Sequence, residues 1–400
     1  MKIKPPALEY SVGMELYKSD MEGIGGRIKQ IPEDFLVEEI MPDGRVLELD
    51  KEVRFNEGER KEYLHFTLQK YNWDTIRAIR VISKRLNVSG KRFGFAGTKD
   101  KRALTTQRVS VWNISSEELR RVRIKDISFR DFSYSSERIT LGDLWGNRFT
   151  IIIRDLGLDD GTLRDRINSV LNELNYKIPN FFGVQRFGTV RPITHLVGRE
   201  ILKKDFKRAV MIYLADIYER ESEESKEARK FLSETEDFQG ALRRFPKHLG
   251  YELAMLNFLA KTPTDFIGAL RRLPKKLRWM FVHAYQAYVF NKALSRYIRE
   301  GIEIERLPLA GYEIKLDEIT SRILEEEGIS QENFKIGEMP ELSSGGVYRD
   351  CFMDVKGFKI LNIDKDELNE GKKKAALRFS LSRGCYTTTV LREIMKNEYW

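Results

Sequence analysis

The densest group of reactive side chains in the sequence lies at residues 94–107, which read GFAGTKDKRALTTQ. Their single carboxylate, Asp100, stands among three cations, Lys99, Lys101 and Arg102. Opposite charges nearby keep an aspartate ionised, and cations suit a phosphate backbone. An anionic oxygen in such a place could act as a nucleophile or a base. The alternative is a charged surface turn with a local ion pair.

This stretch differs from the nucleotide-binding P-loop. A P-loop needs Gly-Lys followed by Ser or Thr at the start of a helix, whereas here Gly97, Thr98 and Lys99 run in another order toward a predicted strand. We predict that the apolar residues through Ala96 end one strand and that Gly97 permits a tight turn.

Two further stretches combine aromatic residues with amides and arginine. They are residues 146–150 (GNRFT) and 180–188 (NFFGVQRFG). Side chains of these types can stack on an extruded base and hydrogen-bond its edge. A hydrophobic turn at a domain boundary would have the same composition, so the pattern alone leaves both interpretations open.

Metal and hydrolase signatures are absent from the sequence. The four histidines have no metal-ligand spacing, and there is no CxxC pair. There is also no GxSxG nucleophile motif. A carboxylate-only metal site, as in a metal-dependent nuclease, has no spacing signature and stays open as an alternative.

Composition narrows the class of protein. The chain has 400 residues, which suggests two or three domains. With 41% hydrophobic and 11% aromatic residues it is not a disordered chain. Two cysteines favour a reducing compartment, so we expect a cytoplasmic protein. No apolar run approaches 18 residues and no signal-peptide pattern is present, so we expect no membrane association.

The charge balance points to a polyanionic partner. Lys and Arg number 70 against 61 Asp and Glu, a net charge of +9. Such a surplus favours nucleic acid as the partner. A heat-adapted protein with a highly charged surface is the other interpretation.

The elements that would position these stretches alternate between strands and helices. Residues 35–40, 63–69, 104–112, 126–134 and 147–154 have strand patterns, and helices are predicted after Asp74 and over 160–176. Residues 198–300 are helical in pattern, with one helix expected over 201–218 and a long one over 277–299. Strand texture returns at 345–363 and 375–391. The sequence therefore predicts an α+β fold on an antiparallel or mixed sheet, with a helix-rich block between two strand-rich blocks.

Taken together, the motifs resemble those of the TruD-type tRNA pseudouridine synthases, which include the eukaryotic Pus-type relatives. Residues 29–39 (KQIPEDFLVEE) resemble the family's N-terminal motif, 95–107 its catalytic motif and 146–149 its third motif. Residues 179–188 resemble the entry into its inserted domain, and 378–381 with 384–393 its C-terminal signature. Asp74-Thr75 stands where bacterial members have Asn-Thr.

This resemblance implies a fold and an activity. The catalytic domain, with a mixed and mostly antiparallel sheet, would comprise residues 1–179 and 351–400. The family's extra helix-rich domain, the TRUD domain, would be inserted at 180–350, with RNA in a basic cleft between the two. The enzyme would isomerise uridine to pseudouridine in tRNA, typically at position 13. It would need no metal, no cofactor and no obligate protein partner.

The resemblance also assigns roles to residues. Asp100 would promote cleavage of the glycosidic bond, either by attacking the anomeric carbon or by removing the 2′ proton, before the uracil turns and rejoins through C5. Among the supporting residues, Lys29 and Arg378 would pair with Asp100 or stabilise the uracil anion. Asn147 would orient the carboxylate or the base. Phe35 and Phe149 would stack on the base. The residues expected to grip phosphates are Lys99, Lys101, Arg102, Arg186 and Arg191. A non-catalytic RNA-binding factor is the competing interpretation. Asp100 argues against it, because a carboxylate in a phosphate-binding loop would only weaken RNA binding.

Overall fold

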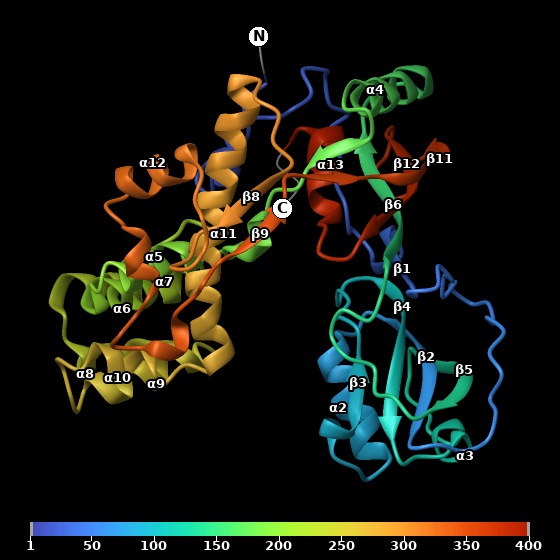
Figure 1. The fold of residues 1–400 in the computed structure, drawn as a ribbon, viewed down its shortest axis with the longest axis horizontal. Coiled ribbons are helices and arrows are strands. Elements are labelled where there is room, and N and C mark those ends of the chain that lie inside the picture. The colour runs from blue at the N-terminus through green and yellow to red at the C-terminus, as the bar shows by residue number, and fades with distance from the viewer. Residues whose placement is uncertain (1–2, 398–400) are drawn as a thin grey trace. The chain divides into compact units, whose positions relative to one another are not determined.

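The computed structural model describes residues 3–397 and divides into two compact units. The first, here called the sheet unit, contains residues 19–178 and 353–397. The second, the helical unit, contains residues 3–18 and 179–352. In Figure 1 the sheet unit carries the blue, green and red strands, and the helical unit carries the yellow and orange helices.

The sheet unit is built on one eight-stranded sheet of order β11-β12-β6-β1-β4-β2-β5, with β3 paired to β4. Strands β1 and β4 are parallel, and the other neighbours in the sheet are antiparallel. The predicted α+β fold with a mixed, mostly antiparallel sheet is therefore confirmed. The strands are β1 (Phe35–Ile40), β2 (Tyr63–Tyr71), β3 (Phe93–Phe95), β4 (Leu104–Trp112), β5 (Ile127–Ser135), β6 (Gly146–Leu156), β11 (Lys356–Lys365) and β12 (Lys373–Ser382). The helices are α2 (Thr75–Arg85), α3 (Ser116–Arg120), α4 (Asp160–Glu173) and α13 (Thr387–Met395).

The half of the sheet around β2 forms its own core. Leu64, Phe66 and Leu68 alternate along β2 and are fully buried, as their spacing predicts. They pack in one cluster with Ile79 and Ile82 of α2. Helix α2 begins where expected, because the side chain of its N-cap, Asp74, accepts a hydrogen bond from the Arg77 amide at 2.8 Å.

The other half of the sheet places three sequence motifs side by side. In the register of β1, β6 and β12, Phe149 pairs with Val37 on one side and with Phe379 on the other. Two residues earlier in β6, Asn147 pairs with Glu39 and Leu381. Segments more than 200 residues apart in the chain therefore meet on adjacent strands.

The helical unit is built around the 26-residue helix α11 (Lys275–Glu300), which confirms the predicted long helix. Helix α5 crosses it closely: a Cβ at Gly198 would lie 2.0 Å from the carbonyl oxygen of Phe281. The other elements are α1 (Ala7–Tyr10), α5 (Thr194–Leu202), α6 (Phe206–Ala215), α7 (Glu223–Thr235), α8 (Phe238–Arg244), α9 (Gly250–Leu259), α10 (Phe266–Leu270), α12 (Glu318–Glu326), β8 (Arg306–Leu309) and β9 (Val347–Asp350). Short strands β7 (Lys177–Pro179) and β10 (Phe352–Asp354) pair with each other.

Two predicted elements are wrong. The single helix expected over 201–218 is two helices, because Lys204 adopts a left-handed conformation (φ 63°) and Asp205 caps α6. The strand texture expected over 375–391 ends at Ser382, and α13 follows. The β-branched residues Thr387, Thr388 and Thr389 favour strands, but they lie at the buried start of this helix, so tertiary packing outweighs propensity.

Within residues 3–397, none of the helices has the length and apolar character needed to cross a membrane.

The close pairing of β6 with β12 gives a first prediction. A Cβ on Gly146, at the start of β6, would lie 2.0 Å from the carbonyl oxygen of Leu381, so Gly146→Ala must push the strands apart beside Asn147. We expect a loss of about 1–3 kcal/mol in the free energy of unfolding, as overpacking typically costs, measured by urea denaturation. Gly97→Ala is the matched control, since its Cβ would meet nothing within 4 Å. Equal stability of the two variants would contradict this account.

Candidate active site

Asp100 lies on the irregular segment between β3 and β4, with its side chain 54% exposed. Its carboxylate Oδ2 is 2.7 Å from the ammonium of Lys29. That ammonium in turn lies 3.9 Å from the centre of the Phe35 ring, a cation–π contact. The structure therefore brings together an accessible carboxylate, a cation and an aromatic ring from two of the motifs.

Three side chains bind the backbone of the loop that carries Asp100. The ammonium of Lys70 donates to the carbonyl oxygens of Asp100 at 3.0 Å, of Lys99 at 3.4 Å and of Trp73. The hydroxyl of Thr75 accepts from the Lys99 amide at 3.0 Å and donates to Gln107 at 2.8 Å. The amide of Gln107 then donates to the Gly97 carbonyl at 3.1 Å. A loop without regular structure is thus held at Gly97, at Lys99 and at Asp100 itself.

Gly97 needs neither a left-handed conformation nor a close approach. Its φ is outside the positive range, and a Cβ there would meet nothing within 4 Å. The expected tight turn therefore does not account for this glycine, which leaves open space beside the loop.

Lys99 anchors the same loop to strand β1. Its ammonium is 2.6 Å from Oε2 of Glu39, and both side chains are almost completely buried. Glu39 also accepts a hydrogen bond from the Arg108 amide at 2.9 Å. Lys99 is therefore a buried ion-pair residue, which does not fit the phosphate contact expected of it.

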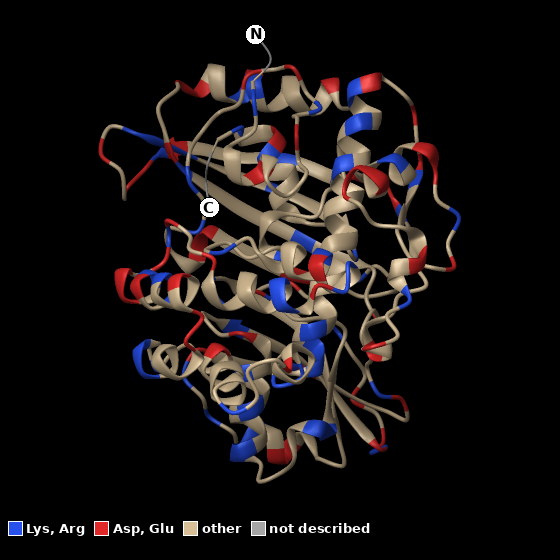
Figure 2. Ribbon diagram, turned by 90° about the vertical axis from the view of Figure 1, so that its left-hand side faces the viewer, with Lys and Arg blue, Asp and Glu red and all other residues tan. Residues whose placement is uncertain are grey.

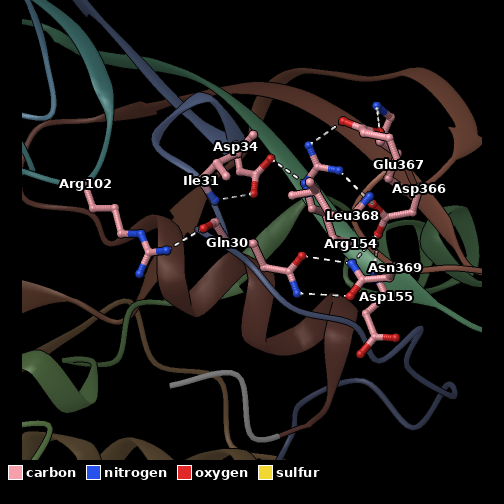
Figure 3. A network of polar contacts seen from close by, with 11 residues as sticks. Gln30, Ile31, Asp34, Arg102, Arg154, Asp155, Asp366, Glu367, Leu368 and Asn369 are labelled. Atoms are coloured by element: carbon pink, nitrogen blue, oxygen red, sulfur yellow. Dashed lines mark hydrogen bonds and ion pairs between the residues drawn. The ribbon is translucent and has the colours of Figure 1, made fainter.

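The segment that carries Lys29 is fixed on both sides of this residue, and Figure 3 shows the contacts that follow it, at Gln30 and Ile31. Lys29 itself has a left-handed backbone (φ 57°), which is unfavourable for a residue with a side chain. Arg27 exchanges two backbone hydrogen bonds of 2.8 Å with Arg154. Gln30 pairs side chain to side chain with Asn369, at 2.9 and 3.5 Å, and its carbonyl accepts from Arg102.

Arg154 stands at the centre of this network and is buried. Its guanidinium binds Asp34 at 2.7 Å, Asp366 at 2.7 Å and Glu367 at 3.0 Å. The hydrogen bonds from Arg154 and then Lys374 lower the pKa of Glu367 to about 2. Asp34 also accepts from the Ile31 amide, so the network reaches the segment that follows Lys29.

The aromatic residues of the site form a buried cluster. The rings of Phe35 and Phe149 meet edge to face at 6.2 Å, and Phe149 lies 5.9 Å from Phe379. Phe35 is only 2% exposed and Phe149 8%. Since the Lys29 ammonium covers one face of Phe35, a base could stack on that face only after Lys29 moves.

Asn147 has an unsatisfied polar atom. Its Oδ1 is shielded from solvent and has no hydrogen-bond partner within residues 3–397. A buried acceptor left in this state costs about 1–3 kcal/mol. Asn147 Oδ1 does not orient the Asp100 carboxylate, because it has no hydrogen-bond partner among residues 3–397, whereas a ligand that donates a hydrogen bond would satisfy it.

Arg378 does not approach Asp100 in this structure. Its Nε donates to the hydroxyl of Thr150 at 3.1 Å, the residue opposite it in the strand pairing. Strand alternation places it on the opposite face of the sheet from its neighbour Phe379. Of the two cations expected beside Asp100, Lys29 is in contact and Arg378 is not.

The remaining cations differ in their surroundings. Lys101 and Arg102 are exposed next to Asp100. Arg186 is partly buried, 6.0 Å from the Phe182 ring. Arg191 donates to the carbonyls of Ile212, Tyr213 and Asp216 and pairs with Glu221, so it has a structural role and does not fit the expected phosphate contact.

Sequence reasoning missed three residues that hold the site: Lys70, Glu39 and Asn369. For Lys70 a signal existed, because it continues the apolar alternation of Leu64, Phe66 and Leu68 toward the interior. A lysine at such a position needs a polar partner inside. Asn369 follows β11 in a turn and carries no pattern that links it to Gln30.

No group of three or more His, Cys, Asp or Glu side chains within residues 3–397 is arranged to hold a metal ion.

Comparisons with known proteins agree with this geometry. A model of the family described as tRNA pseudouridine synthase D (TruD) matches residues 11–311 and 306–394, almost the whole chain. The chain belongs to this family. The resemblance read from its motifs is thereby confirmed.

Relatives match over nearly their whole length. A Methanosarcina acetivorans protein named "Probable tRNA pseudouridine synthase D" is 39% identical over 98% of this chain and 97% of its own. One from Methanocaldococcus jannaschii, named "Probable tRNA pseudouridine synthase D 1", is 41% identical over 94% and 96%. The crystal structure of a Methanosarcina mazei protein assigned as TruD superposes with a TM-score of 0.83 at 38% identity, covering 98% of both chains.

We predict that the Arg154 network makes a large and pH-dependent contribution to the free energy of unfolding. Arg154→Met leaves Asp34 and Asp366 buried without their cation, so we expect a loss of about 3–5 kcal/mol in the free energy of unfolding at pH 7. The pKa of Glu367 falls from 4.5 to about 2 in the folded state. Its contribution to the free energy of unfolding is therefore present above pH 4.5 and disappears as pH falls towards 2. Urea denaturation across this range measures both effects.

Lys51→Met is the control for this prediction, since it removes an exposed pair with Glu48 and should cost under about 1 kcal/mol. Similar losses in the two variants would show that the network does not stabilise the sheet unit.

Proposed function

We propose that this chain isomerises uridine to pseudouridine in tRNA, at position 13 as is usual for the family, with the Asp100 carboxylate opening the glycosidic bond. The observation that supports Asp100 is its setting: an accessible carboxylate paired with Lys29 at 2.7 Å, on a loop whose backbone is held by Lys70, Thr75 and Gln107. A reactive group held in a fixed position lowers the entropy that must be lost to reach the reacting geometry.

The reaction begins with extrusion of the target uridine, which costs a few kcal/mol of stacking. The Asp100 carboxylate then either attacks the anomeric carbon or takes the 2′ proton, and the uracil leaves with the electron pair of the bond from N1 to the sugar. The base turns and its C5 bonds to the anomeric carbon. This displaces the Asp100 carboxylate in the first route, and in the second C2′ takes back the proton held by Asp100. The C5 proton is then lost as N1 gains one. The net change is an isomerisation, so no oxidant or group donor enters the balance.

Lys29 is proposed to stabilise negative charge during this sequence. Its ammonium already binds the reacting carboxylate and lies over the Phe35 ring. A cation held beside the reaction centre stabilises the leaving uracil anion without reorganisation. Phe35 then acts by supporting Lys29, and Phe149 is the remaining candidate for a ring in contact with the base.

Asn147 is proposed to recognise the uracil. A uracil offers an N3–H donor and carbonyl acceptors, which match a side-chain amide. The unsatisfied Oδ1 of Asn147 supplies the acceptor for that N–H. We assign no direct role to Arg378 in this step, because its described partner is Thr150.

The two units correspond in this proposal to the two domains expected from the family. The sheet unit, which holds Asp100, is the catalytic domain, and the helical unit contains the inserted TRUD domain. Residues 3–18 belong to the helical unit, whereas the expected catalytic domain began at residue 1. Lys101, Arg102 and Arg186 remain the proposed phosphate contacts, and tRNA is the proposed partner.

Asp100→Asn tests the assignment. The amide keeps the shape of the side chain but cannot act as nucleophile or base, so we expect pseudouridine formation to fall by at least about 10³-fold with tRNA affinity nearly unchanged. Unmodified tRNA transcript is incubated with a chelator present and then mapped with a pseudouridine-specific chemical probe. Asp165→Asn, an identical change at an exposed residue of α4, should leave activity intact. Multiple turnover by Asp100→Asn would exclude Asp100 as the reacting group.

A further inference from the structure

Within the helical unit, the surplus of positive charge lies in one short segment. Residues 243–278, from the end of α8 to the start of α11, contain nine Lys and Arg and two Asp and Glu, a net charge of +7 against +9 for the whole chain. The next part of the same unit, residues 279–352, has eight Lys and Arg and thirteen Asp and Glu. Charge is therefore unevenly distributed along the helical unit, and residues 243–278 are its basic stretch.

Seven of these cations are exposed and form no ion pair with any carboxylate of residues 3–397. We call them the basic edge: Arg243, Arg244, Lys247, Lys261, Arg272, Lys275 and Lys276. The segment's two acids do not neutralise them, because Glu252 is buried against Arg229 and Asp265 accepts the hydrogen bond that caps α10. Figure 2 shows blue Lys and Arg segments, with red ones among them, on helices at the height where Figure 1 places α8, α9 and α10.

Three of the cations are supported by aromatic rings. Arg244 lies 4.0 Å from the ring centre of Phe231, Arg272 lies 4.2 Å from that of Phe258, and Lys275 lies 4.8 Å from that of Trp279. A side chain resting on a ring has fewer conformations to lose when it binds a ligand. Helices α8 and α9 contact each other, as do α9 and α10, so the elements along this segment are packed together.

We propose that the basic edge binds the phosphate backbone of the tRNA substrate. This proposal rests on the proposed function, which supplies the polyanion, and it concerns a surface in the other unit from Asp100. Exposed cations without protein counterions contribute most to the free energy of RNA binding, because their contact with phosphates releases the ions condensed on the RNA. The edge would thus contribute affinity and leave the chemical step unchanged.

The test removes four charges from the edge in one variant, Lys247→Gln with Lys261→Gln, Lys275→Gln and Lys276→Gln. Binding of tRNA is measured from 50 to 300 mM salt. We expect the slope of log affinity against log salt to become shallower by about 2–3, with affinity near physiological salt reduced roughly 10–100-fold. The rate of pseudouridine formation at saturating tRNA should stay at the wild-type value.

The matched control neutralises four exposed lysines elsewhere in the helical unit, Lys203, Lys230, Lys315 and Lys335, in the same way. It changes the net charge equally, so equal losses in the two variants would overturn the proposal, as would no loss in the edge variant. Loss of binding to anionic lipid vesicles with tRNA affinity intact would also overturn it. Failure of wild-type enzyme to modify tRNA would count against the proposed function alone, because the edge is judged on binding.

A separate observation concerns Lys70, a fully buried lysine. It forms no ion pair with a carboxylate of residues 3–397, and its three acceptors are all backbone carbonyls, of Trp73, Lys99 and Asp100. Burying an ammonium without a counterion is costly. An apolar residue at this position would continue the buried face of β2 without the free-energy cost of a buried charge. Packing alone therefore does not explain a lysine here.

We infer that Lys70 is a positioning residue that fixes the peptide group of Asp100 for the reaction. An ammonium has three N–H donors, which match the three carbonyls it meets. A neutral amine turns a lone pair toward the same oxygens and loses one of these bonds. Positioning therefore depends on the protonated form.

The charge state of Lys70 changes within an accessible pH range. Burial lowers its pKa to about 8, while Asp100 and Asp74 raise it and Lys99 lowers it further. The ammonium is thus present below pH 8 and is lost as pH rises through that value. We expect the loop to be held most firmly in the lower range.

The test compares wild type with Lys70→Met in single-turnover reactions at saturating tRNA between pH 6 and 9.5. The variant should be slower by about 10²-fold below pH 7, as a small misplacement of a reacting group produces, with an unchanged Kd for tRNA. The ratio of wild-type to variant rate should fall as pH passes 8, while titration of the substrate affects both enzymes and cancels.

Lys70→Gln provides a second neutral variant if methionine prevents folding, which urea denaturation reveals. A rate ratio that stays constant over the pH range, or equal rates at pH 7, would show that Lys70 only stabilises the fold.

Discussion

An exposed carboxylate on an irregular loop is useful only if the loop is rigid, and here the rigidity comes from hydrogen bonds between buried side chains and the loop backbone. The carbonyls and amides around Asp100 have no strand or helix partners, so they need others. Lys70, Thr75 and Gln107 supply them from β2, α2 and β4. The core of the half-sheet around β2 and β4 therefore determines where Asp100 stands.

The same constraint explains why Lys29 is not free to move. Its left-handed backbone is unfavourable and persists because Arg27 and Gln30 are bound on either side. Their partners, Arg154 and Asn369, come from β6 and from the turn after β11. The C-terminal strands are consequently part of the support of a residue near the N-terminus, and one sheet must contain both. This is a physical reason why the sheet unit is made of two separated stretches of chain.

Much of this could be predicted from the sequence, and the failures have identifiable causes. Alternation along β2, the Asp74 cap and the long helix α11 are local patterns, and the structure has all three. The motif residues were predicted to cluster, and Asp100, Lys29 and Phe35 are in contact. Helix α13 was missed because burial of its threonines outweighs their strand propensity. The bond between Gln30 and Asn369 joins residues 339 positions apart and has no local trace.

Charge was the property that sequence reasoning located least well, because a formal charge does not reveal where a side chain ends. Lys99 stands in the catalytic motif beside Asp100, yet its ammonium points to Glu39 in the interior, while Lys29, 71 residues away, reaches the carboxylate. Since the buried Glu39 carboxylate already neutralises it, Lys99 has no charge left to offer a phosphate. Only cations without protein partners can exchange their counterions for RNA. The basic edge of the helical unit has such cations, and so does the loop of Asp100, where Lys101 and Arg102 are exposed. In our proposals these cations contribute affinity, whereas Lys29 acts at the carboxylate, so substitutions in the basic edge should alter binding with little effect on the chemical step.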